Sequence, residues 1–280
     1  MSNRIDVKKT YKLYINGAFP RTESGRTYEV KSAKGVFIAN PCLASRKDLR
    51  DAVVAARAAH IGWNKATAYN RGQILYRIAE MLEGRKAQFV EEIVVSTGTT
   101  KVKAEKEVIE SVDRLVWYAG WTDKIASLAG STNPVAGPYY NFTIPESMGV
   151  VAAIAPESPS LLGLIDAIAP IIASGNTVIV LASTKFPLSA MTFAEVLATS
   201  DLPAGVVNIL TGKKEEIAPW MASHMDIDAM DISGVSVKIS HELKVAGAEN
   251  LKRIHSFKGS DPARITTFME AKTVWHPIGL

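Results

Sequence analysis

The chain has 280 residues, of which 47% are hydrophobic and 21% are charged. These values are ordinary for a soluble globular protein, and the length allows one large domain or two modest ones. The net charge is 32 − 28 = +4, an excess too small to indicate a nucleic-acid partner. The basic residues Arg4, Lys8, Lys9 and Lys12 are interpreted as a solvated tail.

Cys42 is the only cysteine, so an intrachain disulfide and the Cys-rich zinc patterns are excluded. The first residues lack the apolar core of a signal peptide. The longest apolar runs, 150–156 and 178–182, are too short to cross a bilayer. The sequence therefore predicts a cytoplasmic protein with no membrane partner.

The N-terminal region begins with short strands and turns. Residues 11–15 are predicted as a strand that ends at the turn dipeptide Asn16-Gly17. After the break at 40–41, Ser45 and Asp48 have the spacing of a helix capping box.

Four helices are expected between residues 45 and 116, because apolar side chains recur there at helical spacing. The stripes are Leu49, Val53 and Ala56; Ile74, Leu75, Ile78 and Leu82; Phe89, Val90, Ile93 and Val94; and Val102, Val108, Ile109, Val112, Leu115 and Val116.

The pattern changes after Gly130. Residues 139–144 alternate as in a strand, with Tyr140, Phe142 and Ile144 on one face. Continuously apolar strands are then predicted at 150–155, 177–181 and 206–210, separated by helices at 161–173 and 188–199. This rhythm predicts a Rossmann-like, doubly wound parallel sheet. A helix at 215–223 and a short strand at 229–232 extend it.

Residues 265–275 alternate again, with Met269 and Trp275 on one face and Lys272 on the other. We interpret them as one strand, which needs a sheet edge to join.

Several motifs resemble the aldehyde dehydrogenase superfamily. They are Met-Gly-Val-Val-Ala-Ala-Ile-Ala-Pro at 148–156, Ala-Ser-Gly-Asn-Thr-Val at 173–178, and Leu-Pro-Ala-Gly-Val-Val-Asn-Ile-Leu-Thr-Gly at 202–212. Tyr-Ile-Asn-Gly at 14–17, Trp-Tyr-Ala-Gly-Trp at 117–121 and Asn-Leu-Lys-Arg at 250–253 fit the same family. The likeness covers nearly the whole chain in unbroken motif order, and it most resembles the shortened second module of two-module aldehyde dehydrogenases.

The resemblance implies an α/β cofactor-domain fold with an N-terminal helical region at 1–133 and 148–261. An oligomerisation β-arm is expected at 134–147 and 262–280. The catalytic domain that the family places between such landmarks is absent, because Lys258 and Ile265 are only seven positions apart.

The catalytic groups of the family are not matched. Its nucleophilic thiolate belongs to the absent domain, and Cys42 precedes the first helix. Ser158 stands where the family has an Asn that donates a hydrogen bond to the oxyanion of the reaction intermediate. The neighbouring Glu157 would oppose the negative charge of that oxyanion. A turn that caps the next helix is therefore the better interpretation of this segment. Phe257 stands where a Glu acts as general base.

The cofactor positions are degenerate. The family has Lys-Pro-Ala-Glu where this chain has Leu-Ala-Ser-Thr at 181–184. Thr184 and Lys185 are therefore only weak candidates for a contact with a ribose or phosphate group. A cap at the start of the next helix explains both residues equally well. Gly234 keeps the close-approach glycine of the pyrophosphate turn, and turn geometry alone also accounts for it. No resident cofactor is expected, although weak NAD binding stays open. The histidines (His60, His224, His241, His255 and His276) lack metal-ligand spacing, so no metal is expected.

These absences predict an inactive aldehyde-dehydrogenase-like subunit that associates with an intact dehydrogenase as a scaffold or regulator, in a hetero-oligomer. Two alternatives are a nucleotide-sensing subunit and an enzyme of unrelated chemistry built around Glu157, Ser158 and Lys185. The expected contact residues on the arm are Tyr140, Phe142, Ile144, Met269, Lys272 and Trp275. The alternative for the arm is that its strands pair with each other and cap their own domain.

Overall fold

A five-stranded parallel sheet lies at the centre of the computed structural model, which describes residues 9–279. Its strand order is β7-β6-β5-β8-β9. The strands are β5 (Val150–Ile154), β6 (Thr177–Leu181), β7 (Val207–Leu210), β8 (Ala229–Asp231) and β9 (Arg253–His255). The predicted doubly wound parallel sheet is confirmed, with β9 added at one edge.

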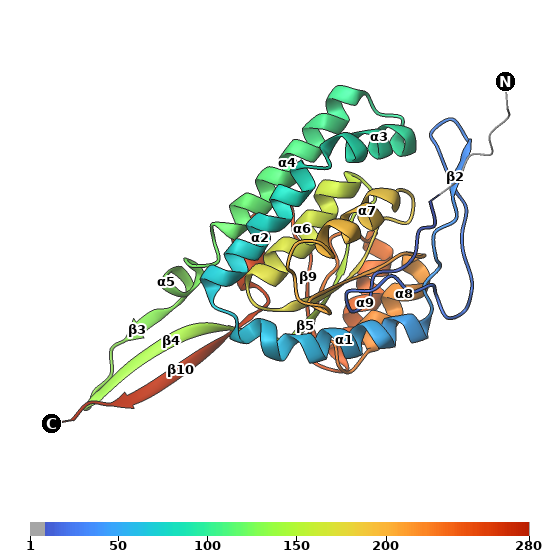
Figure 1. Ribbon diagram of the computed structural model, residues 1–280. Helices are drawn as coiled ribbons and strands as arrows, with labels where there is room; N and C mark the ends of the chain where they lie inside the picture. The colour runs from blue at the N-terminus through green and yellow to red at the C-terminus, as the bar shows by residue number, and fades with distance from the viewer. Residues whose placement is uncertain (1–8, 280) are drawn as a thin grey trace, which may run out of the picture.

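Helices cover both faces of this sheet (Figure 1). They are α1 (Arg46–Lys65), α2 (Ala68–Glu83), α3 (Lys86–Thr97), α4 (Lys101–Ala119), α5 (Ile125–Ala129), α6 (Ser160–Ala173), α7 (Leu188–Leu197), α8 (Lys214–Ser223), α9 (Val237–Ala248) and α10 (Ala263–Thr266). Helices α6 and α7 pack on one face with α2–α4 outside them, and α1, α8 and α9 pack on the other.

The strands are apolar throughout because both of their faces are buried. Along β5, Val151 and Ala153 belong to the core beneath α6 and α7. Val150 and Ala152 belong to the core beneath α1 and α8. Alternate side chains of one strand thus supply two separate cores.

Local signals place the start of α1 and the Asn16-Gly17 turn correctly. Ser45 and Asp48 form the predicted capping box, with the Asp48 amide donating to Ser45 Oγ at 3.2 Å and the Ser45 amide to Asp48 Oδ2 at 2.7 Å. Asn16 and Gly17 turn the chain with φ of 53° and 73°. The predicted strand at 11–15 is reduced to isolated bridges, one of which pairs Tyr14 with Ile209 at the β7 edge. A small hairpin of β1 (Val30–Lys31) and β2 (Phe37–Ala39) follows.

The predicted solvated tail is only partly described, because Arg4 and Lys8 lie outside the described residues. Lys9 differs from the prediction. Its Nζ forms an ion pair with Glu195 Oε1 at 2.8 Å and donates to Thr192 Oγ1 at 3.0 Å. The Lys9 side chain is therefore held against α7, although the residue is exposed.

A second, antiparallel sheet projects from the body as an arm (Figure 1). Its strand order is β10-β4-β3, with β3 (Ser131–Asn133), β4 (Tyr139–Ser147) and β10 (Met269–Pro277). Strands β4 and β10 pair from Met269↔Ser147 to Pro277↔Tyr139. The predicted arm bounds of 134–147 and 262–280 differ from this sheet, because β3 precedes residue 134 and β10 begins after residue 268; residue 280 lies outside the described part.

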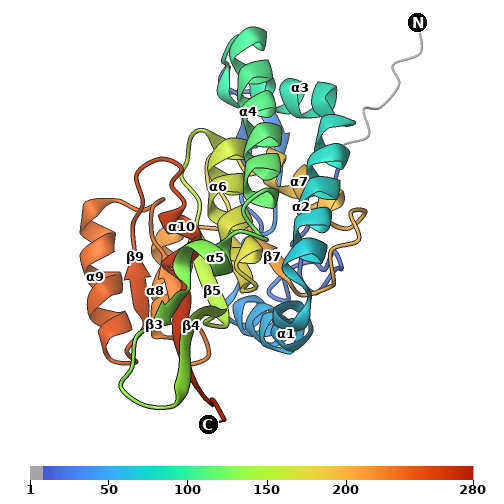
Figure 2. The ribbon, with the colours of Figure 1, turned by 90° about the vertical axis from the view of Figure 1, so that its left-hand side faces the viewer.

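The predicted single strand over 265–275 is wrong in its first part. Residues Ala263–Thr266 form α10, and the strand begins only at Met269. Ile265 and Phe268 are both 1% exposed, because a helical turn directs these two side chains, three positions apart, into the same core. Figure 2 shows α10 between the body and the base of the arm.

Candidate functional site

The topology of the parallel sheet marks one crevice as the candidate site. From β5 the chain continues to β6 and β7 on one side, and then crosses to β8 and β9 on the other. In open α/β sheets ligands bind outside the carboxyl ends of the strands where the order reverses. Here that place lies between β5 and β8, and we call it the switch-point crevice, bounded by residues 155–158 and 232–235.

Lys214 places its ammonium group in this crevice. Its Nζ donates to the carbonyl oxygens of Ala155 at 2.7 Å and Gly234 at 2.9 Å, which follow β5 and β8. The residue is 5% exposed. Sequence reasoning missed Lys214, although a cation in the first turn of a helix opposes the helix dipole and is a signal of another role.

Glu157 supplies the counter-charge. Its Oε1 lies 2.8 Å from Lys214 Nζ, while Oε2 accepts from Ser183 Oγ at 2.6 Å and the Lys185 amide at 3.0 Å. Burial alone would raise the pKa of Glu157, but the hydrogen bonds from Lys214 and Ser183 outweigh it and hold the pKa below its usual value. The carboxylate thus joins the ends of β5 and β6 to the start of α8.

The predicted cluster of Ser158, Glu157 and Lys185 is assembled only in part. Lys185 reaches Glu157 through its backbone amide, and both Lys185 and Ser158 are exposed. Thr184 Oγ1 donates to the Gly212 carbonyl at 2.7 Å, which ties the end of β6 to the end of β7. Helix α7 has Pro187 at its N-cap and no side-chain cap, so the cap considered for Thr184 is not formed.

Gly234 is required by close backbone packing. Its amide donates to the Ile154 carbonyl at 3.0 Å. A Cβ at this position would lie 2.3 Å from the Ile154 oxygen and 2.2 Å from the Ala155 oxygen. The retained glycine is therefore explained by the approach of its own chain to β5.

Arg264 of α10 fills the neighbouring space. It is 5% exposed; its Nη2 lies 3.2 Å from Asp231 Oδ2, and its Nη1 donates to the Asp166 carbonyl at 3.1 Å. The guanidinium group lies 4.8 Å from the ring centre of Phe257. Burial raises the pKa of Asp231, and the charge of Arg264 opposes that shift. Position 257, where the family has a base, instead supports a buried cation.

The N-terminus of α6 is also satisfied internally. The amides of Leu161 and Leu162 donate to Glu107 Oε1 at 2.8 and 3.4 Å. As predicted, the segment 156–160 bends before this helix and supplies its N-cap residue, Pro159, but it gives no side-chain cap, and the capping carboxylate comes from α4. Burial raises the pKa of Glu107 despite these bonds.

These contacts bear on whether a dinucleotide fits the crevice. Phosphate groups bind free amides at a helix N-terminus and a glycine turn. In this chain Glu107 occupies the amides of α6, and Lys214 and Glu157 occupy the gap between β5 and β8. The N-terminus of α9, which follows the Gly234 turn, has no side-chain cap. The side chains that oppose a dinucleotide in this conformation are therefore Lys214 and Glu157, which occupy the gap between β5 and β8.

Cys42 is buried in a packed apolar region and is not one of the residues that bound the crevice. It is 4% exposed and belongs to the core beneath α1 and α8. Its amide donates to the Tyr11 carbonyl, and its own carbonyl accepts from Thr211 Oγ1 at 2.6 Å. A thiol held in this way is not presented to a substrate from solution.

The six predicted arm contacts do not share one face. The register places Tyr140, Phe142 and Ile144 opposite His276, Val274 and Lys272, so these side chains share what we call the even face. Met269 and Trp275 project from the opposite, odd face, where Trp275 packs edge-on against Tyr139 at 5.7 Å. A hollow of about 570 Å³ beside α5 is lined by Tyr140, Phe142 and Ile144.

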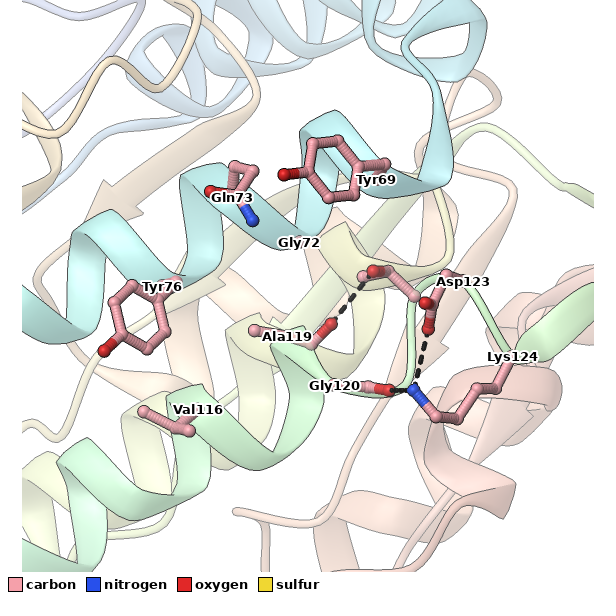
Figure 3. A pocket seen from close by; sticks show the side chains of 10 residues that line it. Tyr69, Gly72, Gln73, Tyr76, Val116, Ala119, Gly120, Asp123 and Lys124 are labelled. Atoms are coloured by element: carbon pink, nitrogen blue, oxygen red, sulfur yellow. Dashed lines mark hydrogen bonds and ion pairs between the residues drawn. The ribbon is translucent and has the colours of Figure 1, made fainter.

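A smaller hollow of about 280 Å³ lies between α2 and α4, and sequence reasoning did not indicate it (Figure 3). Tyr69 and Tyr76 border it and are 69% and 56% exposed. Lys124 Nζ lies 2.9 Å from Asp123 Oδ1 and also donates to the Gly120 carbonyl. Because its charged groups neutralise each other, this hollow does not resemble a catalytic centre.

Neither a metal cluster nor a helix that could cross a membrane is found in residues 9–279. Over that range, no group of three or more His, Cys, Asp or Glu side chains is arranged to hold a metal ion. Over the same range, none of the helices is both long and apolar enough to cross a membrane.

The fold and the crevice define a Rossmann-like α/β protein with an attached β-arm. Residues 20–268 match the aldehyde dehydrogenase family, and the chain belongs to that family. It is 33% identical over 260 residues to cytosolic 10-formyltetrahydrofolate dehydrogenase of Xenopus tropicalis, covering 90% of this chain and 28% of that protein. It is 34% identical over 255 residues to retinal dehydrogenase 2 of Gallus gallus, covering 89% of this chain and 48% of that protein.

Solved structures give the same result. A mutant form of aldehyde dehydrogenase from Bacillus cereus superposes with a TM-score of 0.82 at 28% identity, covering 88% of this chain and 50% of that chain. PnpE in complex with nicotinamide adenine dinucleotide superposes with a TM-score of 0.85 at 28% identity, covering 90% and 51%. The chain therefore spans about half the length of these proteins, or less.

Proposed function

We propose that this chain is a non-catalytic member of the aldehyde dehydrogenase family that associates through its arm with an intact aldehyde dehydrogenase. The observation that carries the proposal is the connection at residues 256–268. These residues lead from β9 directly to β10, and on the way Arg264 is buried against Asp231. The resemblance places the catalytic domain of the family at this point in the chain.

The chemistry of the remaining residues supports an inactive subunit. Aldehyde oxidation by the family mechanism begins with attack of a thiolate on the carbonyl carbon. Cys42 is buried, and Phe257 has no proton to exchange. An exposed Ser158 beside Glu157 does not form a preorganised oxyanion site.

The arm supports an assembly role. On its even face Tyr140 is 48% exposed, and its ring lies 5.3 Å from that of Phe142. Exposed aromatic side chains on a projecting sheet are suitable anchors for a protein partner. The arm strands pair with each other, but they extend outward instead of capping their own domain (Figures 1 and 2).

The main competing function is nucleotide sensing, which is favoured by the likeness to a dinucleotide complex of PnpE. Calorimetric titration of the purified chain with NAD and with NADP separates the two. We expect no saturable heat, because Lys214 and Glu157 occupy the crevice. Saturable binding in the micromolar range would favour the sensing function instead.

The assembly proposal is tested by tagging this chain in its native source, purifying it under mild conditions and identifying the bound proteins by mass spectrometry. We expect an aldehyde dehydrogenase that retains its catalytic domain, in a fixed ratio to the bait. Recovery of this chain without any dehydrogenase would overturn the proposal.

A further inference from the structure

The outer edge of β10 carries backbone groups whose direction follows from the register. The Ile278 amide donates to the Pro138 carbonyl at 2.8 Å, and this pair continues the register of β10 with β4. In an antiparallel pair, directly bonded residue pairs alternate with non-bonded ones. Lys272, Val274 and His276 therefore direct their amide and carbonyl groups toward β4.

The odd-numbered residues of β10 direct their backbone amide and carbonyl groups away from β4. One contact supports this assignment independently, because the Met269 carbonyl accepts from Arg253 Nη1 at 2.8 Å, outside the arm sheet. Within the described residues β10 pairs with β4 alone. Ala271, Thr273 and Trp275 thus present amides and carbonyls along an exposed edge.

Both ends of this free edge are closed. At the base of the arm, Arg253 occupies the Met269 carbonyl and forms an ion pair with Glu270 at 2.8 Å. At the tip, Pro277 has no amide hydrogen to donate. The edge therefore offers complete bonding groups only at Ala271, Thr273 and Trp275.

This segment is complementary to itself. When two copies run antiparallel with Thr273 opposite Thr273, Ala271 lies opposite Trp275 in both directions. Each free amide and carbonyl then has a hydrogen-bond partner. If one copy is shifted by two residues along the other, Ala271 or Trp275 must instead pair with Pro277, which has no amide hydrogen, or with Met269, whose carbonyl is already bonded. An isologous contact requires this reciprocity, in which residue i contacts j and j contacts i.

The side chains agree with the same register. The small Ala271 lies opposite the large Trp275, which is 59% exposed in the single chain. The two Thr273 side chains form a β-branched cross-strand pair, and Glu270 lies opposite His276. A register that placed Glu270 opposite Glu270 would bring like charges together.

From these features we infer that two copies of this chain associate by pairing their β10 edges about Thr273, which joins the two arms into one continuous sheet. This contact uses the edge of the arm and leaves the even face with Tyr140 and Phe142 free. It goes beyond the proposed function, because it sets a two-fold arrangement of this chain whether or not a dehydrogenase is bound.

The inference is tested with the purified full chain by site-directed oxidation. In the paired register the two Thr273 Cα atoms are about 5.5 Å apart, as in any directly bonded antiparallel pair, and that separation suits a disulfide. Thr273→Cys should therefore give a covalent dimer on mild oxidation, with little background because the native Cys42 is buried. His276→Cys is the matched control; this residue is also exposed but lies far from its own copy in this register, so the variant should stay monomeric.

Sedimentation equilibrium supplies a second readout without a cysteine. The wild-type chain should show reversible monomer–dimer association. Thr273→Pro removes one outward amide from each copy and keeps the ladder to β4, so the dissociation constant should rise about tenfold or more. Thr273→Val loses the hydroxyl bond to Thr143 but keeps the amide, and it should associate like the wild type.

Three outcomes would overturn the inference: a wild-type chain that stays monomeric at the highest soluble concentration, equal cross-linking of the 273 and 276 variants, or normal association of Thr273→Pro. Failure to recover a dehydrogenase from the native source would contradict the proposed function but not this pairing of two copies, so the two proposals can be rejected independently.

Discussion

Lys214 Nζ lies 2.8 Å from Glu157 Oε1, and this ion pair closes the crevice between β5 and β8. Lys214 is almost wholly buried, whereas the Glu157 side chain is 31% exposed. A buried ammonium group is tolerated only when an opposite charge and carbonyl oxygens satisfy it. Here Glu157, Ala155 and Gly234 do so, which makes the closed crevice a stable part of this fold.

Lys214→Ala should lower the free energy of unfolding by about 1–3 kcal/mol, because two buried carbonyl groups and the Glu157 carboxylate lose their donor. Thermal unfolding followed by circular dichroism measures this change. Lys213→Ala is the control, since Lys213 is exposed and its removal should alter stability by less than about 0.5 kcal/mol. Equal effects of the two substitutions would show that the crevice contacts contribute little.

Arg264→Met should be more damaging, because it leaves Asp231, which is 2% exposed, without its cation. Breaking a buried pair by removing one partner costs on the order of 3–5 kcal/mol. Urea denaturation of Arg264→Met, and of Arg264→Met combined with Asp231→Asn, measures the loss and its recovery. A double variant no more stable than the single one would contradict the pairing.

Because Lys252 is buried, we predict that the free energy of unfolding rises at alkaline pH. Burial lowers its pKa from 10.5 to about 8, and its Nζ donates to the carbonyl oxygens of His224 and Ile227. Between about pH 8 and the unfolded value of 10.5, the unfolded chain holds this proton more tightly than the folded one. The folded state is therefore favoured as the pH rises through this window.

Lys252→Met removes the titrating group and provides the comparison. Urea unfolding of both proteins at about pH 7, 9 and 10 should show the wild type gaining stability relative to the variant at each step. A difference between the two proteins that stays constant with pH would rule out this assignment.

The even face of the arm is predicted to carry the contact with the dehydrogenase. Tyr140→Glu places a charge among Phe142 and Ile144 and should reduce recovery of the partner at least about tenfold, with little change in thermal stability because Tyr140 is 48% exposed. Co-purification followed by quantitative mass spectrometry measures it. Tyr139→Glu introduces the same charge at a tyrosine that is 43% exposed on the odd face, and it should leave recovery unchanged.

The central sheet could be predicted from sequence because its signals are local. Continuous apolar runs and turn dipeptides mark β5, β6 and β7, and the Ser45–Asp48 spacing marks the start of α1. Helix α9 was missed because its apolar stripe is short: Ile239, Leu243 and Ala246 pack on the core beneath α1 and α8, and only Leu243 of these is fully buried. Helix α10 was interpreted as strand because a single helical turn is too short to establish a period.

The candidate site was less accessible to sequence reasoning, because its key contacts join distant segments. Lys214 contacts Ala155 and Glu157, which lie more than 50 positions earlier in the sequence, and Arg264 contacts Asp231 through the connection that precedes the arm. The split of the arm contacts between two faces likewise depends on the register of β4 with β10, which no local pattern fixes. The resemblance to the family identified which groups had changed, but not which side chains now fill their place.

The most direct test of the central claim is to incubate the pure, correctly folded chain with NAD and a panel of aliphatic and aromatic aldehydes, and to follow reduction of the nicotinamide. We predict no aldehyde-dependent reduction at any protein concentration. Reduction that scales with the amount of chain, and that is lost in Cys42→Ala, would contradict the assignment of a non-catalytic role.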